Sequence, residues 1–219
     1  MGLSAQTAYT MSKIAYKTFT HLQNARIKRQ KKRLAEFAQY FETRYEVMTN
    51  QDKQKLNQFI ESEEGESLLA DYTDSILKVS SSRVMMAMAL LFCDGTDFTD
   101  VEKSTFIIAS KDLSDDLINF YILAHKKEKY EHNNLPYAKC SFSNDNCHIF
   151  LINGWDQETI SLYIEQLIRL KFLLPDPLPI TGFTTKSNIW SLNFGISNKT
   201  QRVVNLLVKS EALLINSSS

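Results

Sequence analysis

The stretch that decides the fold is residues 155–214, which reads WDQETISLYIEQLIRLKFLLPDPLPITGFTTKSNIWSLNFGISNKTQRVVNLLVKSEALL. Asp156 is a residue type that caps helix N-termini, and the apolar positions after it follow helical spacing until three prolines end the pattern. Those positions are Ile160, Tyr163, Ile164, Leu167, Ile168 and Phe172, and the prolines are Pro175, Pro177 and Pro179. Residues 180–185 and 188–193 then read as two short strands, and a last helix begins near Ser197.

A helix, a two-stranded hairpin and a second helix in this order and at these lengths are typical of a winged-helix module. We therefore expect a mainly α fold, with a helical N-terminal and middle region and a C-terminal winged-helix-like module that carries a small β-hairpin. The expected organisation is a basic amphipathic helical region at residues 1–64, a helical core at 65–130, and the winged-helix-like module at 131–219. The module shares the helix at 114–130 with the core.

Acidic residues on the first helix of this stretch disfavour DNA recognition. A helix that reads DNA needs cationic or amide side chains toward the bases and phosphates. This helix instead begins with Asp156 and Glu158 and adds Glu165. A cation follows near its end, at Arg169, and the turn between the strands offers Lys186 alone. We therefore expect the module to contact protein, with DNA as the alternative.

Charge is distributed unevenly along the chain although the formal net charge is zero. Residues 1–47 hold nine Lys or Arg against three Glu, whereas residues 52–74 are acidic. The cations of the densest basic run are Arg26, Lys28, Arg29, Lys31, Lys32 and Arg33. The simplest interpretation of this run is a solvated helix face. The alternatives are an arm that contacts nucleic-acid phosphates or a contact with an anionic membrane surface.

Residues 5–48 contain neither Pro nor Gly and predict one or two helices. Apolar residues recur every seven positions and predict an amphipathic helix over about residues 22–48, with a candidate coiled-coil seam. They are Ile27, Leu34, Phe41 and Met48. Gln30 and Arg44 occupy the other seam positions and disfavour a coiled coil. We therefore expect this helix to pack against the protein's own body, with a homodimer through it as the alternative.

Several further helices are expected between residues 49 and 130. Residues 49–64 read as a short helix ended at Gly65, and a second helix follows up to Leu77. Residues 83–92 are apolar on nearly every side and predict the most buried helix. Thr99 with Glu102 forms a capping box, and Ser114 is another strong N-cap; we expect a helix after each.

Residues 131–154 read as a loop or short strands, and 147–152 are a strand candidate. Two cysteines and three histidines close together invite a zinc interpretation: His125, His132, Cys140, Cys147 and His148. Structural zinc sites have a pair of ligands two to four residues apart, which is missing here, so we expect no metal and no cofactor. Catalysis by a Cys–His pair is disfavoured too, because neighbouring side chains in a strand point in opposite directions.

The three cysteines and the absence of a secretory pattern favour a reduced, cytoplasmic protein. Cys93 lies beside the apolar run 84–92 and reads as an inert buried thiol. That run is far shorter than the roughly 18 residues of a membrane span, so we expect none.

The order of features resembles that of abortive-infection alpha-type proteins of bacteria and prophages, a group linked to phage resistance. The matching pieces within about residues 66–210 are the apolar helix at 83–92, the segment 106–117, the helix ending near Leu174, and residues 190–195 before the last helix. That family usually has Gly where this chain has Lys171. The resemblance implies a role in phage defence or prophage exclusion and supplies no catalytic residue.

The sequence therefore predicts a non-enzymatic protein-interaction module with a protein partner, whose contact surface is the charged N-terminal helix, the 131–154 loop, or both. The alternative is a winged-helix DNA-binding regulator that uses residues 26–33 as its phosphate-contacting arm. A third interpretation is an enzyme or toxin with a site around residues 125–148.

Overall fold

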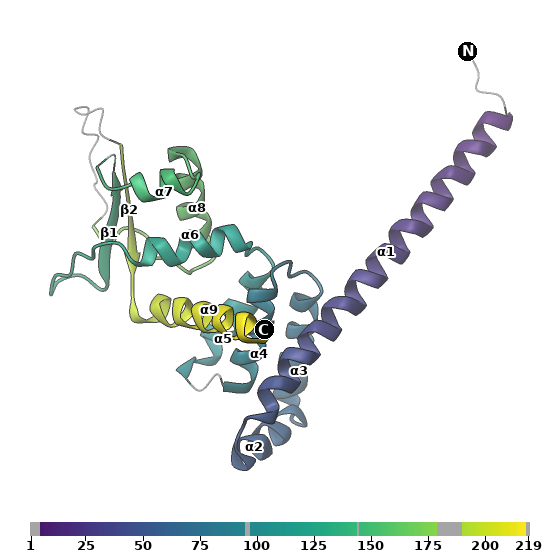
Figure 1. Cartoon of the computed structure of the whole chain (residues 1–219), viewed down its shortest axis with the longest axis horizontal. Helices are drawn as coiled ribbons and strands as arrows, with labels where there is room; N and C mark the ends of the chain where they lie inside the picture. Colours follow the sequence, from purple (N-terminus) through teal and green to yellow (C-terminus); the bar gives the residue numbers. More distant parts are fainter. Residues whose placement is uncertain (1–4, 95–96, 144, 179–189, 218–219) are drawn as a thin grey trace. The chain divides into compact units, whose positions relative to one another are not determined.

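The computed structural model describes residues 5–94, 97–143, 145–178 and 190–217. They form two compact units, an N-terminal unit within residues 1–78 and a C-terminal unit within 79–219 (Figure 1). The N-terminal unit holds α1 (Ala5–Glu46), α2 (Asn50–Ile60) and α3 (Glu63–Ile76). The C-terminal unit holds α4 (Ser82–Asp94), α5 (Asp100–Ser110), α6 (Asp115–His125), β1 (Ala138–Ser143), α7 (His148–Ile152), α8 (Gln157–Arg169), β2 (Ser191–Ile196) and α9 (Asn198–Ser217). The predicted mainly helical fold with a small antiparallel sheet near the C-terminus is confirmed.

The long helix α1 packs on α3 within the N-terminal unit. Its 42 residues correspond to a length of about 60 Å. The ring of Phe37 lies 6.2 Å from that of Tyr72, which is almost fully buried. Gly65, predicted to end a helix, instead lies in the first turn of α3, where a Cβ would overlap the carbonyl oxygen of Phe59. Glycine is therefore required there by a close approach of α2.

The core of the C-terminal unit is built around α4 and α9. Every residue from Val84 to Leu91 is buried, so the prediction of a helix that is apolar on all sides is confirmed. The two predicted N-caps are also confirmed. Thr99 and Glu102 form a reciprocal capping box at α5, and the Ser114 hydroxyl accepts from the N–H of Leu117 at α6.

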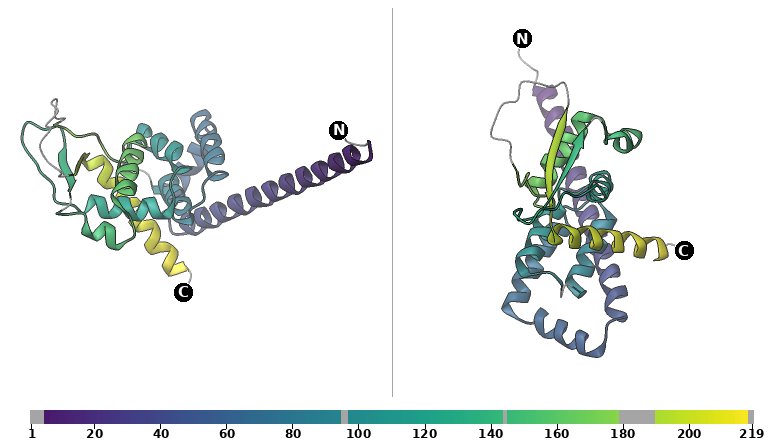
Figure 2. Two further views of the ribbon diagram at one scale, coloured as in Figure 1. Left: turned by 90° about the horizontal axis from the view of Figure 1, so that it is seen from above. Right: turned by 90° about the vertical axis from the view of Figure 1, so that its left-hand side faces the viewer.

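β1 and β2 pair antiparallel in the C-terminal unit, with Ala138 opposite Ile196 and Ser143 opposite Ser191 (Figure 2). Leu174 bridges the outer side of β2 at Gly195, through two backbone hydrogen bonds of 2.7 and 2.9 Å. The predicted strand at 180–185 lies outside the described residues. The second predicted strand, 188–193, corresponds in part to β2, whose partner in the described sheet is β1.

The strand predicted at residues 147–152 is wrong, because His148–Ile152 form the short helix α7. The side-chain oxygen of Asn146 accepts from the N–H of Ser143, at the end of β1, and its amide donates to the carbonyl of Ser141. One side chain of α7, Phe150, is fully buried. A five-residue segment with a single anchor offers no periodicity from which helix and strand could be distinguished.

Among the described residues, no helix is both long enough and apolar enough to cross a membrane.

Candidate functional site

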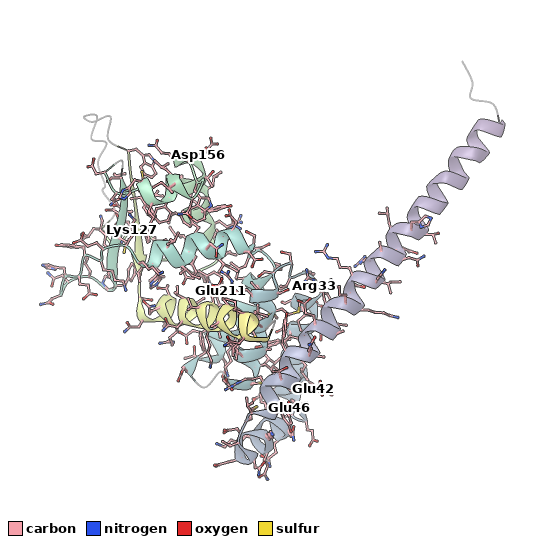
Figure 3. The ribbon with its side chains drawn as sticks, viewed as in Figure 1. Arg33, Glu42, Glu46, Lys127, Asp156 and Glu211 are labelled. Carbon is pink, nitrogen blue, oxygen red and sulfur yellow. The ribbon has the colours of Figure 1, made fainter. Side chains whose placement is uncertain are left out.

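Helix α8 is amphipathic and its start is fixed by Asp156 (Figure 3). The Asp156 carboxylate accepts from the N–H of Thr159 at 2.8 Å, and this hydrogen bond lowers the pKa of Asp156. Three side chains spaced by four and three residues, Ile160, Ile164 and Leu167, are fully buried. The predicted N-cap and the predicted buried face of this helix are therefore confirmed.

One carboxylate ties α8 to the first turn of α6. The indole N–H of Trp155 lies 3.1 Å from each carboxylate oxygen of Asp116, and the Tyr163 hydroxyl donates to the same group at 2.5 Å. The hydrogen bond to Asp116, together with burial, raises the pKa of Tyr163 to about 12. Asp116 therefore holds residues on both sides of the α8 N-terminus in one position.

An aromatic cluster supports α7 and α8 from the core side. The ring of Phe120, on α6, is fully buried, and it lies 5.2 to 6.1 Å from four other rings. These belong to Phe142, Phe150, Trp155 and Tyr163. Because the cluster joins β1, α7 and α8 to one residue of α6, the two helices form a firmly supported surface.

The exposed side chains of α7 and α8 include both apolar and acidic types. Leu162 on α8 is 57% exposed, and Ile152 at the end of α7 is 82% exposed. We define the α7–α8 surface by its exposed residues Ile149, Leu151, Ile152, Glu158, Leu162 and Glu165. The sequence predicts the two carboxylates but not the exposed apolar residues of α7, because it places residues 147–152 in a strand.

The structure divides the basic run of α1 into two sets. Arg26 and Arg29 line a groove with Asp74 at the end of α3, and Arg33 pairs with Glu36 at 3.2 Å. The three lysines, Lys28, Lys31 and Lys32, are exposed. Helical spacing places these lysines on the side of α1 opposite the arginines. The six predicted site residues therefore do not form one cationic face.

The His and Cys residues considered for zinc are spread over the C-terminal unit. His125 and Cys140 are buried, Cys147 is buried before α7, and His132 and His148 are exposed. Burial raises the pKa of the Cys140 thiol to about 11, which makes it unreactive near neutral pH. Within the described ranges, no three His, Cys, Asp or Glu side chains gather in a way that could hold a metal ion.

His125 instead belongs to a buried contact with the start of α9. Its Nε2 lies 3.0 Å from the hydroxyl oxygen of Thr200, and the Tyr121 hydroxyl donates to the Thr200 carbonyl at 2.8 Å. Burial, with a smaller contribution from Lys129, lowers the pKa of His125 to about 4. The imidazole is therefore neutral near pH 7.

Lys127 is a half-buried cation that the sequence alone does not single out. Its ammonium nitrogen lies 5.4 Å from the Phe142 ring centre and 5.3 Å from that of Phe150, and it donates to the carbonyl of Asn146. Burial lowers the pKa of Lys127. This cation–π contact fixes the turn between β1 and α7.

A cavity of about 700 Å³ lies in the C-terminal unit between the start of α9, the end of α8 and the segment before β1. Its apolar walls include Tyr137, Phe172, Leu174, Ile196 and Val203. A volume of this size lies within the range of small-molecule sites. The sequence does not predict the cavity, because its walls come from segments far apart in the chain.

Lys171, which also lines the cavity, has an unusual backbone conformation. Its φ is 63°, in the left-handed region, directly after α8. The N–H of Phe172 donates to the carbonyl of Leu167 at 2.9 Å, and the N–H of Lys171 to that of Ile168 at 3.0 Å. This is the helix ending in which glycine normally occupies the left-handed position. A side chain there costs about 1 kcal/mol.

Comparison of the chain with protein-family models, with curated proteins and with solved structures finds no match.

Proposed function

We propose that this chain is a non-enzymatic protein-interaction module whose C-terminal unit contains a winged-helix-like module. The order of elements supports the proposal: α6, β1, α7, α8, the bridge at Leu174, and β2. β2 lies between β1 and Leu174. Winged-helix modules follow the same order of helices and strands, and α8 takes the place of the helix that reads DNA in such modules.

The observation that carries the proposal is the chemistry that α8 presents to solvent. Glu158 and Glu165 are exposed on either side of Leu162, which is itself 57% exposed. Carboxylates on this helix would repel DNA phosphates, whereas an exposed leucine gains from burial against a protein. The fitting partner surface is basic with apolar side chains, because it complements both features of the α7–α8 surface.

The cellular setting that we propose is phage defence or prophage exclusion. This setting rests on the resemblance to abortive-infection alpha-type proteins. The proposed protein binding by α8 does not depend on that resemblance. Expression of the intact chain in a bacterial host, followed by phage challenge, tests it directly. Unchanged plaque numbers with and without the protein, across a panel of phages, would contradict the proposed setting.

The interaction itself is tested by capture from the host with quantitative mass spectrometry. We expect Leu162→Asp to remove the proteins that the unaltered chain captures. Val208→Asp is the matched control, because Val208 is 44% exposed on α9, outside the α7–α8 surface. Capture that is equal for both variants and the unaltered chain would contradict the proposal.

The second candidate function, a DNA-binding regulator, is favoured by the three exposed lysines on α1. It requires duplex DNA binding that weakens between about 50 and 200 mM salt. It also requires loss of that binding when Lys28, Lys31 and Lys32 are changed to Glu, with the α3-facing Arg29 changed to Glu as the comparison. On the leading proposal we expect no such binding at the lower salt concentration.

A further inference from the structure

We propose that the cavity at the start of α9 binds a small anionic molecule with an apolar body, and that Lys171 is its principal anion contact. The inference concerns small-molecule binding and depends on neither the α7–α8 surface nor a protein partner. Three observations carry it: the composition of the walls, the conformation of Lys171, and the charges that line the cavity.

The apolar residues of the cavity wall indicate that the ligand has an apolar part. Apolar side chains line part of the cavity, among them Tyr137, Leu174 and Val203. Tyr137 is held in place by its hydroxyl, which donates to the carbonyl of Pro175 at 3.1 Å. Apolar side chains next to polar and charged groups are typical of sites that bind small organic molecules.

Lys171 gives the first indication of what the polar groups bind. At this helix ending, glycine would adopt the same backbone without strain, and the exposed Lys171 side chain gains little from packing. Unfavourable backbone conformations that packing does not explain are concentrated at binding sites. Lys171, which lines the cavity, is therefore the residue whose side chain requires a role.

The remaining charges leave the cavity with an excess of positive charge. Lys129 and Lys199 line it together with Lys171. The carboxylate of Glu102 is already engaged by Arg202 and by the N–H of Thr99. Glu131 is the other carboxylate that lines the cavity. Among the described residues that line the cavity, three ammonium groups therefore stand against the single remaining carboxylate of Glu131.

The first turn of α9 adds to this positive potential. Ser197 caps the N–H of Thr200, and Asn198 and Lys199 lie in the turn whose N–H groups have no partner within the helix. No acidic residue lies in that turn. The 20-residue helix therefore directs the positive end of its dipole toward the cavity that these residues line. Ammonium groups and a helix N-terminus beside an apolar wall fit an aromatic or aliphatic carboxylate.

The test measures binding to the full chain by isothermal titration calorimetry. The probe is 2-naphthoate, and the neutral 2-naphthamide is its shape-matched control. We expect 2-naphthoate to bind and Lys171→Gly to weaken its binding by up to about fivefold, the upper end of the range measured for loss of one exposed charge contact. We expect 2-naphthamide to bind more weakly than the anion and to be insensitive to the substitution.

The same variant has a second expected result, a change in thermal stability opposite in direction to the change in binding. Because glycine relieves the left-handed strain, Lys171→Gly should raise the unfolding midpoint by about 2–4 °C while binding falls. Lys111→Gly is the matched control: Lys111 also follows a helix, but its φ is −64°, so glycine should neither stabilise the fold nor weaken the probe.

The proposal is overturned if 2-naphthoate does not bind, if it binds Lys171→Gly as tightly as the unaltered chain, or if 2-naphthamide binds as tightly as the anion. A more stable Lys171→Gly variant that has lost binding would establish that the lysine is retained for the ligand at the expense of stability.

Discussion

The indole N–H of Trp155 lies within 3.1 Å of both carboxylate oxygens of Asp116. Trp155 precedes α8, and Asp116 lies in the first turn of α6, so this contact sets the angle at which α8 leaves the core. Tyr163, in the second turn of α8, donates to the same carboxylate. The outward direction of Leu162 and Glu165 follows from this arrangement.

Asp116→Ala should lower the free energy of unfolding by about 2–3 kcal/mol, because it removes charge-assisted hydrogen bonds to two side chains and leaves the Trp155 N–H unpaired. Urea unfolding followed by Trp fluorescence measures the change. Asp112→Ala is the control, since Asp112 contributes its backbone carbonyl, not its carboxylate, to the contact with Gln166. Equal stability of the two variants would contradict the role given to Asp116.

Much of the helical structure was predictable because its signals are local. N-caps at Thr99, Ser114 and Asp156 each depend on a few neighbouring residues, and the structure confirms all three. The sheet was not predictable in the same way. Its two strands are separated by α7 and α8, and the pairing depends on long-range contacts that no spacing in the sequence records. α7 was assigned wrongly because one buried residue, Phe150, defines no period.

Gly195 provides a second test, centred on the cavity wall. A Cβ at this position would overlap the ring of Tyr137 and lie 3.0 Å from the Cβ of Leu174. Gly195→Ala should therefore displace the Tyr137 ring and lower stability by about 1–3 kcal/mol. Ser191→Ala, at an exposed position of the same strand, should change stability by less than about 0.5 kcal/mol. The unfolding midpoints of the two variants measure this difference. An unchanged midpoint for Gly195→Ala would contradict the close packing of the Tyr137 ring against Gly195.

Stability should depend on pH through His125. The pKa of His125 is lowered to about 4 in the folded chain, against an ordinary value of 6.5, so the unfolded chain takes up the proton first as pH falls. The stabilisation is therefore complete above pH 6.5 and is lost between about 6.5 and 4, by at most about 3 kcal/mol. Urea unfolding across this range should show that loss in the unaltered chain.

His125→Gln isolates this effect from the carboxylates that titrate in the same range. The difference in unfolding free energy between the two proteins should change with pH between 6.5 and 4 and level off outside it. A constant difference across the range would mean that His125 is not buried in its neutral form.

The homodimer through α1 is a further proposal with its own test. Ile27 and Leu34, seven residues apart, are 50% and 40% exposed. If they form a seam with a second copy, Ile27→Glu/Leu34→Glu should convert a dimer to a monomer in light scattering. The control is Lys32→Gln/Gln39→Glu, which changes the charge equally on another side of the helix. A monomeric unaltered chain at high concentration would contradict the dimer.

The sequence predicts the candidate site only where the charge of a side chain is enough to exclude a class of partner. Glu158 and Glu165 were recognised as unsuited to DNA from their positions after Asp156, since a cap fixes the register of a helix. The basic run behaved differently: six cations within eight residues necessarily spread around a helix, so Arg29 and Lys31 point in different directions. The sequence does not predict the left-handed conformation of Lys171, because that conformation depends on how α8 ends.

The central claim, that the α7–α8 surface binds a protein, is tested most directly by a photo-crosslinking amino acid placed at position 162 and, separately, at position 208 of the full chain in its host. The account predicts discrete protein adducts from position 162 that are missing from position 208. Adducts to nucleic acid at position 162, or the same protein adducts from both positions, would contradict it.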